Sequence, residues 1–276
     1  MTDSAAQQAD VPAAPLAVIG GSGFERFLDD VTEVEIDTPW GAPSAPIAIG
    51  KLGERSVAFV PRHGHGHRLA PNQVPYRANL WALHEVGAQR VFAACASGSL
   101  QPHLVPGDFV ICDQLVDRTT GRVDTFFDGD VVNHVSFADP FCPELRAAAY
   151  ASGLATGISV HDGGTVVVIQ GPRFSTRAES VWFRNNGWGV VNMTQYPESI
   201  LARELGLCYA TIAMVTDFDA GVEGDPNLPS VMQNDVFALI AANADRVRTL
   251  LVDTLSTVAL QPTCGCAAAT NGVLPK

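Results

Sequence analysis

The run Arg62-His63-Gly-His65-Gly-His67-Arg68 concentrates positive charge that is scarce elsewhere in this acidic chain. An arginine suits bidentate binding of phosphate, and a neighbouring histidine can donate to another phosphate oxygen. Three histidines at a spacing of two could instead ligate zinc, and the run could also be a plain solvated loop. Because two glycines make the segment flexible and no carboxylate lies nearby in sequence, the pattern favours phosphate over a metal.

A second candidate is the glycine-rich turn Gly20-Gly21-Ser22-Gly23, which directly follows an apolar run. Where side chains are missing, backbone N–H groups can approach an oxyanion, and the Ser22 hydroxyl adds a donor. A dinucleotide fingerprint would require glycine where Arg26 stands, and the Gly-Lys-Ser/Thr ending of a Walker-type loop is absent. The turn alone is equally compatible with a purely structural role.

Further polar groups follow other apolar runs, namely Gly171-Pro-Arg-Phe174-Ser175, Asn192-Met193-Thr194 and Thr216-Asp217-Phe218-Asp219. Each of them could be merely a turn. If the two aspartates instead lie in a pocket, burial would raise a carboxyl pKa and allow that group to donate a proton.

Apolar runs typical of buried strands alternate with helical patterns along the chain. Strands are expected at Leu16–Ile19, Val57–Val60, Val91–Ala94, Phe109–Ile111, Val166–Ile169, Val190–Met193 and Tyr209–Val215. Helices are expected at Tyr76–Val86, from a capping box at Thr176 to Gly187, at Pro197–Leu205 and over about Val231–Val258. This order predicts a single α/β domain with a central, largely parallel or mixed β-sheet flanked by helices. In such sheets ligands bind outside the carboxyl ends of the strands.

Composition limits the class of protein. The chain has 276 residues, 47% of them hydrophobic, which is enough for one large domain with a sizeable core. With 17 basic and 29 acidic residues the net charge is -12, so neither a nucleic acid nor an anionic membrane is an expected partner. No run approaches the roughly 20 apolar residues of a membrane-spanning helix. We expect a flexible lead-in at residues 1–15, the domain at 16–260 and a C-terminal tail at 261–276.

Six cysteines are scattered along the chain, at positions 95, 112, 142, 208, 264 and 266. Small buried thiols are common in apolar segments, so a reduced setting is the simpler interpretation. Residues 1–15 contain no Lys, no Arg and no apolar run, unlike a secretory or transit peptide, and a cytoplasmic location is expected. Cys264-Gly-Cys266 could form a redox pair, although two free thiols on a tail fit a reduced compartment better.

Several motifs in fixed order carry a family resemblance. They are Gly20-Gly-Ser22-Gly, Pro61-Arg62-His63-Gly, Ala78-Asn-Leu-Trp-Ala-Leu, Gly98-Ser-Leu, Pro106-Gly-Asp-Phe-Val, Asp117-Arg-Thr-Thr, Gly171-Pro-Arg-Phe-Ser, Asn192-Met-Thr194 with Pro197-Glu198, and Thr216-Asp217-Phe-Asp219. From about Leu16 to the final helix, their order and spacing resemble the S-methyl-5'-thioadenosine phosphorylases, which belong with the trimeric purine nucleoside phosphorylases. The resemblance implies a pentosyltransferase that converts 5'-deoxy-5'-methylthioadenosine and inorganic phosphate to adenine and 5-methylthioribose 1-phosphate. It also implies a role in purine and methionine salvage, without a metal or organic cofactor.

The resemblance assigns roles by matching position. Phosphate displaces adenine at C1' through an oxocarbenium-like transition state, so the site must hold an anion and accept charge on the leaving base. The residues implied for phosphate are Ser22, Arg62, His63, Thr194, Cys95 and Ala96. Those implied for ribose, base and the 5' substituent are Asn192, Met193, Phe174, Ser175, His134, Val236 and Phe237. The 5' pocket would be supplied partly by a neighbouring subunit of a homotrimer, although ordinary core or interface packing would equally explain His134, Val236 and Phe237.

The two aspartates bear on base choice. By resemblance, Asp217 would deliver a proton to the purine N7 edge as the C–N bond breaks, and Asp219 would accept from the exocyclic amine. Members of the wider family that act on 6-oxopurines typically present an Asn, which can donate to a carbonyl. A site with the wrong pattern leaves a buried group unpaired, at a cost of about 1–3 kcal/mol. Adenine is therefore favoured over hypoxanthine.

Departures from the family pattern leave alternatives open. Cys95 stands where a Thr usually contacts phosphate, and since a thiol is a weak donor that contact would pass to the backbone of Ala96. Gln170 and Gln195 replace a typical Glu and Thr, so a phosphorylase for methylthioinosine or 6-oxopurine nucleosides is an alternative. Outside the enzymes, the chain could be a catalytically inactive nucleoside- or metal-binding protein that uses the histidine-rich loop.

Overall fold

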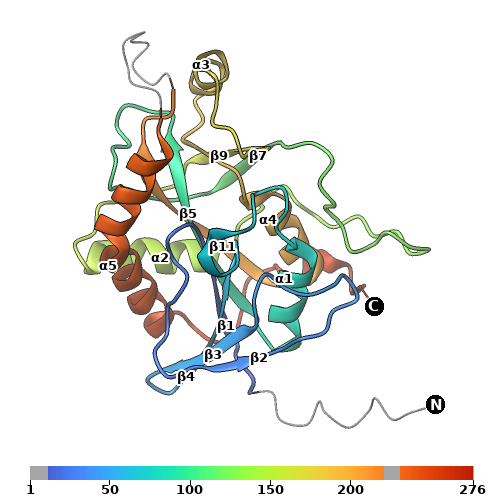
Figure 1. The fold of residues 1–276 in the computed structure, drawn as a ribbon. Helices are drawn as coiled ribbons and strands as arrows, with labels where there is room; N and C mark the ends of the chain where they lie inside the picture. The colour runs from blue at the N-terminus through green and yellow to red at the C-terminus, as the bar shows by residue number, and fades with distance from the viewer. Residues whose placement is uncertain (1–11, 221–230, 276) are drawn as a thin grey trace, which may run out of the picture.

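The structure is a computed structural model that describes residues 12–220 and 231–275 (Figure 1). The strands are β1 (Leu16–Gly20), β2 (Thr32–Val34), β3 (Ile47–Leu52), β4 (Arg55–Pro61), β5 (Arg90–Ser99), β6 (Phe109–Ile111), β7 (Gln114–Arg118), β8 (Val160–Asp162), β9 (Thr165–Ile169), β10 (Val190–Asn192) and β11 (Cys208–Asp217). The helices are α1 (Tyr76–Glu85), α2 (Pro143–Ala155), α3 (Arg177–Asn185), α4 (Gln195–Glu204) and α5 (Gln233–Thr257), with 3-10 turns η1 (His65–His67) and η2 (Ala267–Thr270). Residues 1–11 of the predicted lead-in and Lys276 of the predicted tail lie outside the described residues, so the boundaries of both segments stay predictions.

All of these strands join one mixed sheet. Its main order is β2-β3-β4-β1-β5-β10-β9-β7, and β11, β6 and β8 extend from β5 as a branch. β1 runs parallel to β4 and β5, and β11 runs parallel to β5. By contrast, β10 is antiparallel to β5, and β6 is antiparallel to β11. The prediction of a single α/β domain around a mixed sheet is confirmed.

The central strands are buried on both faces because their side chains alternate between two hydrophobic clusters. In β5, Val91 belongs to the cluster that contains Leu83 of α1, whereas the next residue, Phe92, belongs to the cluster that contains Leu145 of α2 and Leu250 of α5. Figure 1 shows α2 and α5 on one side of these strands and α1 and α4 on the other. Burial on both faces explains why the central strands are continuous apolar runs rather than alternating ones.

Each strand and helix predicted from the apolar runs is present, with ends that differ by a few residues. The capping box of α3 is formed, since the Thr176 side chain accepts from the Glu179 backbone N–H. Sequence reasoning missed α2 and the strands β2, β3, β7 and β8. β2 and β7 are largely exposed, so they carry no apolar run. Across residues 12–220 and 231–275, the structure has no helix with the length and apolar character needed to span a bilayer.

Candidate active site

A cavity of about 430 Å³ lies beyond the carboxyl ends of β1, β4 and β11, beside the last residues of β5. Nearly all of the predicted site residues line it, namely Ser22, Arg62, His63, Cys95, Ala96, Phe174, Ser175, Asn192, Met193, Thr194, Asp217, Asp219, Val236 and Phe237. His134 is not among the lining residues of its own chain. It is exposed, and its carbonyl oxygen accepts from Asn271 Nδ2 at 3.0 Å. A contribution of His134 to a neighbouring subunit's site therefore stays a prediction.

Arg62 is held at the cavity wall by a buried ion pair. Its Nε and Nη2 atoms donate to the two carboxylate oxygens of Glu198 at 2.6 and 2.8 Å, and Nη1 donates to the Ala94 carbonyl at 3.0 Å. Tyr209 donates its hydroxyl to Glu198 Oε1 at 2.7 Å. The side chains of Arg62 and Glu198 are both 0% exposed. Since a guanidinium has more N–H groups than these contacts use, Arg62 keeps donors for an anion in the cavity.

The ion pair keeps Arg62 charged despite its burial. Desolvation on its own lowers the pKa of Arg62, but the charge and hydrogen bonds of Glu198 outweigh it, and the pKa lies well above its ordinary value. Gly21, which also lines the cavity, permits this arrangement, because a Cβ there would lie 3.2 Å from Arg62 Nη1 and 2.5 Å from the Ala94 carbonyl oxygen. A fixed cation therefore faces the glycine turn in a protein that is acidic overall.

His63 is a neutral ring with a defined tautomer. Burial and the adjacent charge of Arg62 lower the pKa of His63 to about 3. Its Nδ1 lies 2.8 Å from the Leu69 carbonyl oxygen. Because a carbonyl oxygen only accepts, Nδ1 carries the proton and Nε2 is left as an acceptor. The predicted donation from His63 to a phosphate oxygen is therefore revised, since this ring can accept the hydroxyl hydrogen of a hydrogen phosphate.

Cys95 enters the cavity as a neutral thiol. Burial raises the pKa of Cys95 to about 11. Asn192 Nδ2 lies 3.5 Å from Cys95 Sγ and 3.4 Å from Ser97 Oγ, which ties the end of β10 to β5. Asn192 Oδ1 in turn accepts from the backbone N–H of Thr194 at 3.3 Å. Asn192 thus connects the end of β10 to β5 and to the start of α4, while it also lines the cavity.

A local irregularity of β11 aims Asp217 into the cavity. The register with β5 shifts between Val215 and Asp217, so that Asp217 lies opposite Gly98. Bulges of this kind re-aim a side chain and often lie next to active sites. Thr216 Oγ1 donates to Asp217 Oδ2 at 2.7 Å, and the Asp219 N–H donates to Asp217 Oδ1 at 2.8 Å. Burial nevertheless raises the pKa of Asp217, because it outweighs these hydrogen bonds.

Asp219 offers a polar atom without a partner. Burial, and to a smaller extent the nearby charge of Asp217, raise the pKa of Asp219. Within the part of the chain that the structure describes, Asp219 Oδ2 and Ser175 Oγ are buried and have no hydrogen-bond partner. Buried polar atoms are nearly always satisfied in folded proteins. Because both residues line the cavity, a ligand with polar edges would satisfy them.

The histidine-rich loop does not form a metal site with its three histidines. His63 and His67 line the cavity with ring centroids 4.3 Å apart, whereas His65 is exposed and does not line it. The His67 ring meets Phe237 edge-on, with 5.4 Å between centroids. Among residues 12–220 and 231–275, no group of three potential metal ligands includes a histidine. The loop instead contacts α5 through His67 and Phe237, which together with Val236 line an apolar end of the cavity.

Sequence reasoning missed Glu198 and Tyr209 as parts of the site. Pro197-Glu198 stood inside a recognised motif, but no local pattern indicates that its carboxylate pairs with a residue 136 positions away. Tyr209 lay in a predicted strand and looked like an ordinary core residue. The sequence offered one signal, the position of Glu198 within the family motif Pro197-Glu198.

The fold and a match over residues 15–255 show that the chain belongs to the phosphorylase superfamily.

Individual relatives give a more specific comparison than the superfamily match does. The chain is 54% identical over 260 residues to the S-methyl-5'-thioadenosine phosphorylase of Mycolicibacterium smegmatis, covering 94% of this chain and 96% of the relative. It is 49% identical over 272 residues to the purine nucleoside phosphorylase of Streptomyces coelicolor, covering 95% and 96%. The structure of methylthioadenosine phosphorylase from Schistosoma mansoni in complex with adenine is similar with a TM-score of 0.87 and 35% identity, covering 94% of this chain and 96% of that one.

Replacing Glu198 tests the buried ion pair. Glu198→Gln keeps the shape but leaves the Arg62 charge buried without its counter-charge, a change that typically costs about 3–5 kcal/mol. We expect the free energy of unfolding, measured with urea, to fall by about 3 kcal/mol and calorimetric phosphate binding to weaken. The exposed Glu54, replaced as Glu54→Gln, serves as control and should leave both unchanged. If Glu198→Gln had the free energy of unfolding of the wild type, the ion pair would be dispensable for stability.

Gly98 tests the positioning of Asp217. A Cβ at position 98 would lie 2.9 Å from Asp217 Oδ1 and 3.2 Å from Val191 Cγ1. Gly98→Ala should therefore displace the carboxylate and lower kcat by about tenfold or more, in line with the sensitivity of catalysis to small misplacements. Gly129→Ala is the matched control, because a Cβ there would meet no atom within 4 Å. Unchanged kcat in Gly98→Ala with an intact fold by circular dichroism would argue against this positioning role.

Proposed function

We propose that this protein catalyses the phosphorolysis of 5'-deoxy-5'-methylthioadenosine to adenine and 5-methylthioribose 1-phosphate. One observation carries the proposal: a single cavity joins the Arg62 cation, fixed by Glu198, to the half-buried carboxyl group of Asp217 and the buried one of Asp219. Its volume of about 430 Å³ falls in the usual range for small-molecule sites. The name of the M. smegmatis relative supports the same substrate.

At the phosphate end, donors converge on an anion. Ser22, Arg62 and Thr194 supply hydroxyl and guanidinium donors, and the glycine turn brings backbone N–H groups close. His63 Nε2 accepts the hydroxyl hydrogen, which fixes the orientation of the nucleophile. The bound anion then lies beneath C1', where its negative charge stabilises the oxocarbenium-like transition state. The main catalytic contributions are the orientation of the phosphate, which residues at the strand ends fix, and the negative charge of the phosphate itself.

At the base end, the carboxyl groups of Asp217 and Asp219 interact with the departing adenine. Burial favours the protonated form of Asp217, which suits donation to N7 as the C–N bond breaks. Repulsion between the two carboxylates disfavours the doubly ionised state, so the pair holds one proton more readily than none. The second carboxylate, Asp219, then accepts from the 6-amino group through its unpartnered Oδ2. This pattern supports a 6-aminopurine over a 6-oxopurine.

The 5' substituent fits the apolar end. Val236 and Phe237 of α5 line the cavity next to His67, and Met193 lines the same cavity. A methylthio group suits such a lining better than a hydroxyl does, because a hydroxyl buried there would lack a partner. We infer that adenosine is the poorer substrate.

The second candidate is a purine nucleoside phosphorylase with a broader range of bases. The 49% identity to the S. coelicolor relative of that name favours it specifically. The two candidates share the phosphate site and differ in the base and 5' ends of the cavity.

We further propose that the enzyme is a cytoplasmic homotrimer that needs no metal or organic cofactor for catalysis. Val131 and Val132 are 54% and 75% exposed and lie in the same segment as His134, which supports burial of that segment against another chain. Phosphate and nucleoside supply every atom of the reaction. Light scattering measures the oligomeric state, and a dimer or monomer would contradict the trimer.

A phosphate-dependence assay tests the function. Purified protein is given methylthioadenosine, adenosine, methylthioinosine or inosine, each with phosphate and in rigorously phosphate-free buffer. We expect base release only with phosphate, fastest from methylthioadenosine. Equal release without phosphate would make the enzyme a hydrolase, and a preference for inosine would establish the second candidate.

Asp217→Asn tests the proton donor. An Asn can donate a hydrogen bond to N7 but cannot deliver a proton, so kcat on methylthioadenosine should fall by about 100-fold, the usual contribution of general acid catalysis. Since Asp217 must be protonated to act, wild-type kcat/KM should fall as pH rises through its raised pKa, and the variant should lack that decline. The exposed Asp37, changed as Asp37→Asn, is the control. Full activity of Asp217→Asn would refute the role.

A further inference from the structure

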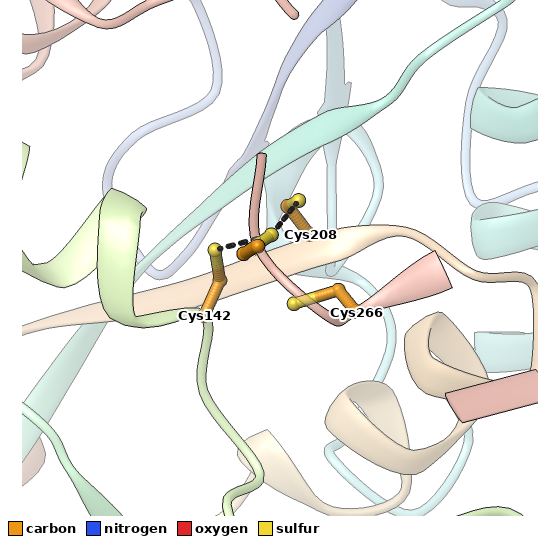
Figure 2. A group of neighbouring side chains, drawn as sticks. Cys142, Cys208 and Cys266 are labelled. Carbon is orange, nitrogen blue, oxygen red and sulfur yellow. Dashed lines mark hydrogen bonds between the residues drawn. The ribbon is translucent and has the colours of Figure 1, made fainter. Parts of the chain in front are cut away.

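Four cysteines from three separate parts of the sequence meet at the amino end of β11. Cys142 directly precedes α2, Cys208 begins β11, and Cys264 and Cys266 follow α5 in the C-terminal segment. All four sulfur atoms lie within 4.8 Å of one another. Figure 2 shows the side chains of Cys142, Cys208 and Cys266 pointing toward a common centre. The prediction of two free thiols on a tail did not foresee this cluster.

The distances suit a shared ligand better than a pairwise bond. Cys264 Sγ lies 3.3 Å from Cys208 Sγ and 3.6 Å from Cys142 Sγ, so one sulfur has two close partners. A disulfide would use only one of these contacts, whereas a metal ion uses all four sulfurs together. In a tetrahedral zinc site with Zn–S bonds of about 2.3 Å, the sulfurs are about 3.8 Å apart. The cluster is close to this spacing before any ligand is added.

We propose that Cys142, Cys208, Cys264 and Cys266 bind one zinc ion as a structural site. Binding converts four thiols to thiolates and releases their protons to solvent, so no oxidant or reductant is required. Structural zinc sites are closed and four-coordinate, and here three of the four cysteines are buried while Cys264 is partly exposed. Cys142 is the N-cap residue of α2, where the positive end of the helix dipole favours a thiolate.

The surroundings already hold the C-terminal segment in place for such a site. Arg90, the register partner of Cys208, donates through Nη2 to the Gln261 carbonyl at 2.8 Å. Glu144 accepts from the Thr263 backbone N–H at 3.0 Å, two residues after Gln261. The guanidinium of Arg90 is fully buried there and pairs with Glu144 at 2.7 Å, which holds the start of α2 to the end of the sheet.

The zinc would be structural because it lies far from the cavity. Cys208 and Asp217 are the two ends of β11, which at the usual rise per residue are about 30 Å apart. Zinc would therefore fasten the C-terminal segment to the start of β11 and α2 without contacting substrate. Its loss should lower the thermal midpoint and leave kcat unchanged at temperatures well below that midpoint.

Metal analysis tests the site in the full chain. Protein is produced with zinc supplied, purified under reducing conditions, and its metal content is measured by plasma mass spectrometry. We expect about one zinc per chain, and close to none in Cys208→Ser or Cys264→Ser. Cys112→Ser is the matched control, because Cys112 is also buried but lies outside the cluster, and it should keep its zinc.

Three further measurements keep the test decisive if a cysteine variant folds poorly. Wild-type protein stripped of metal and given Co²⁺ should show the visible absorption of tetrahedral cobalt thiolate. Thiol titration and intact mass under non-reducing conditions distinguish the alternatives. Wild-type protein that binds neither zinc nor cobalt, with its thiols free, would overturn the proposal. Protein with the same cysteines joined as disulfides would overturn it equally.

Discussion

The buried pair of Arg62 and Glu198 is the interaction on which the rest of the site depends. A cation in a fully buried position is tolerated only when a counter-charge and hydrogen bonds accompany it, and Glu198 provides both with two short contacts. The pair links the end of β4 to α4, across the face of the sheet that α1 and α4 cover. Burial, and after it the charge of Arg62, lower the pKa of His63. The cation that we propose for phosphate binding therefore belongs to the core rather than to the surface.

The opposite wall of the cavity depends on backbone geometry rather than on charge. The register shift in β11 and the absence of a side chain at Gly98 together make room for the Asp217 carboxylate. Burial then raises its pKa, which an exposed strand end would not do. The ends of two strands thus bring a permanently charged cation and a carboxyl that favours its neutral form to one cavity. The proposed displacement of a base by an anion would use both groups.

Much of the fold was predictable from sequence, because the central strands are buried on both faces and therefore appear as continuous apolar runs. The exposed strands β2 and β7 gave no such signal. At the site, residues in sharp turns after strands, such as Ser22 and Asp217, were identifiable from their positions. Glu198 and the four-cysteine cluster were not, since both depend on contacts between residues more than 50 positions apart. Local patterns carry no information about such pairings.

The tautomer of His63 has a consequence for anion selectivity. With Nδ1–H committed to the Leu69 carbonyl, the ring offers only a lone pair to whatever occupies the oxyanion site. Hydrogen phosphate carries a hydroxyl hydrogen that can satisfy that lone pair, whereas sulfate, which has nearly the same size and shape, carries none at neutral pH. Sulfate would leave that lone pair without a hydrogen to accept, so we expect sulfate to bind more weakly than hydrogen phosphate. A single ring nitrogen without a proton would thus favour one of two tetrahedral oxyanions that an arginine alone distinguishes poorly.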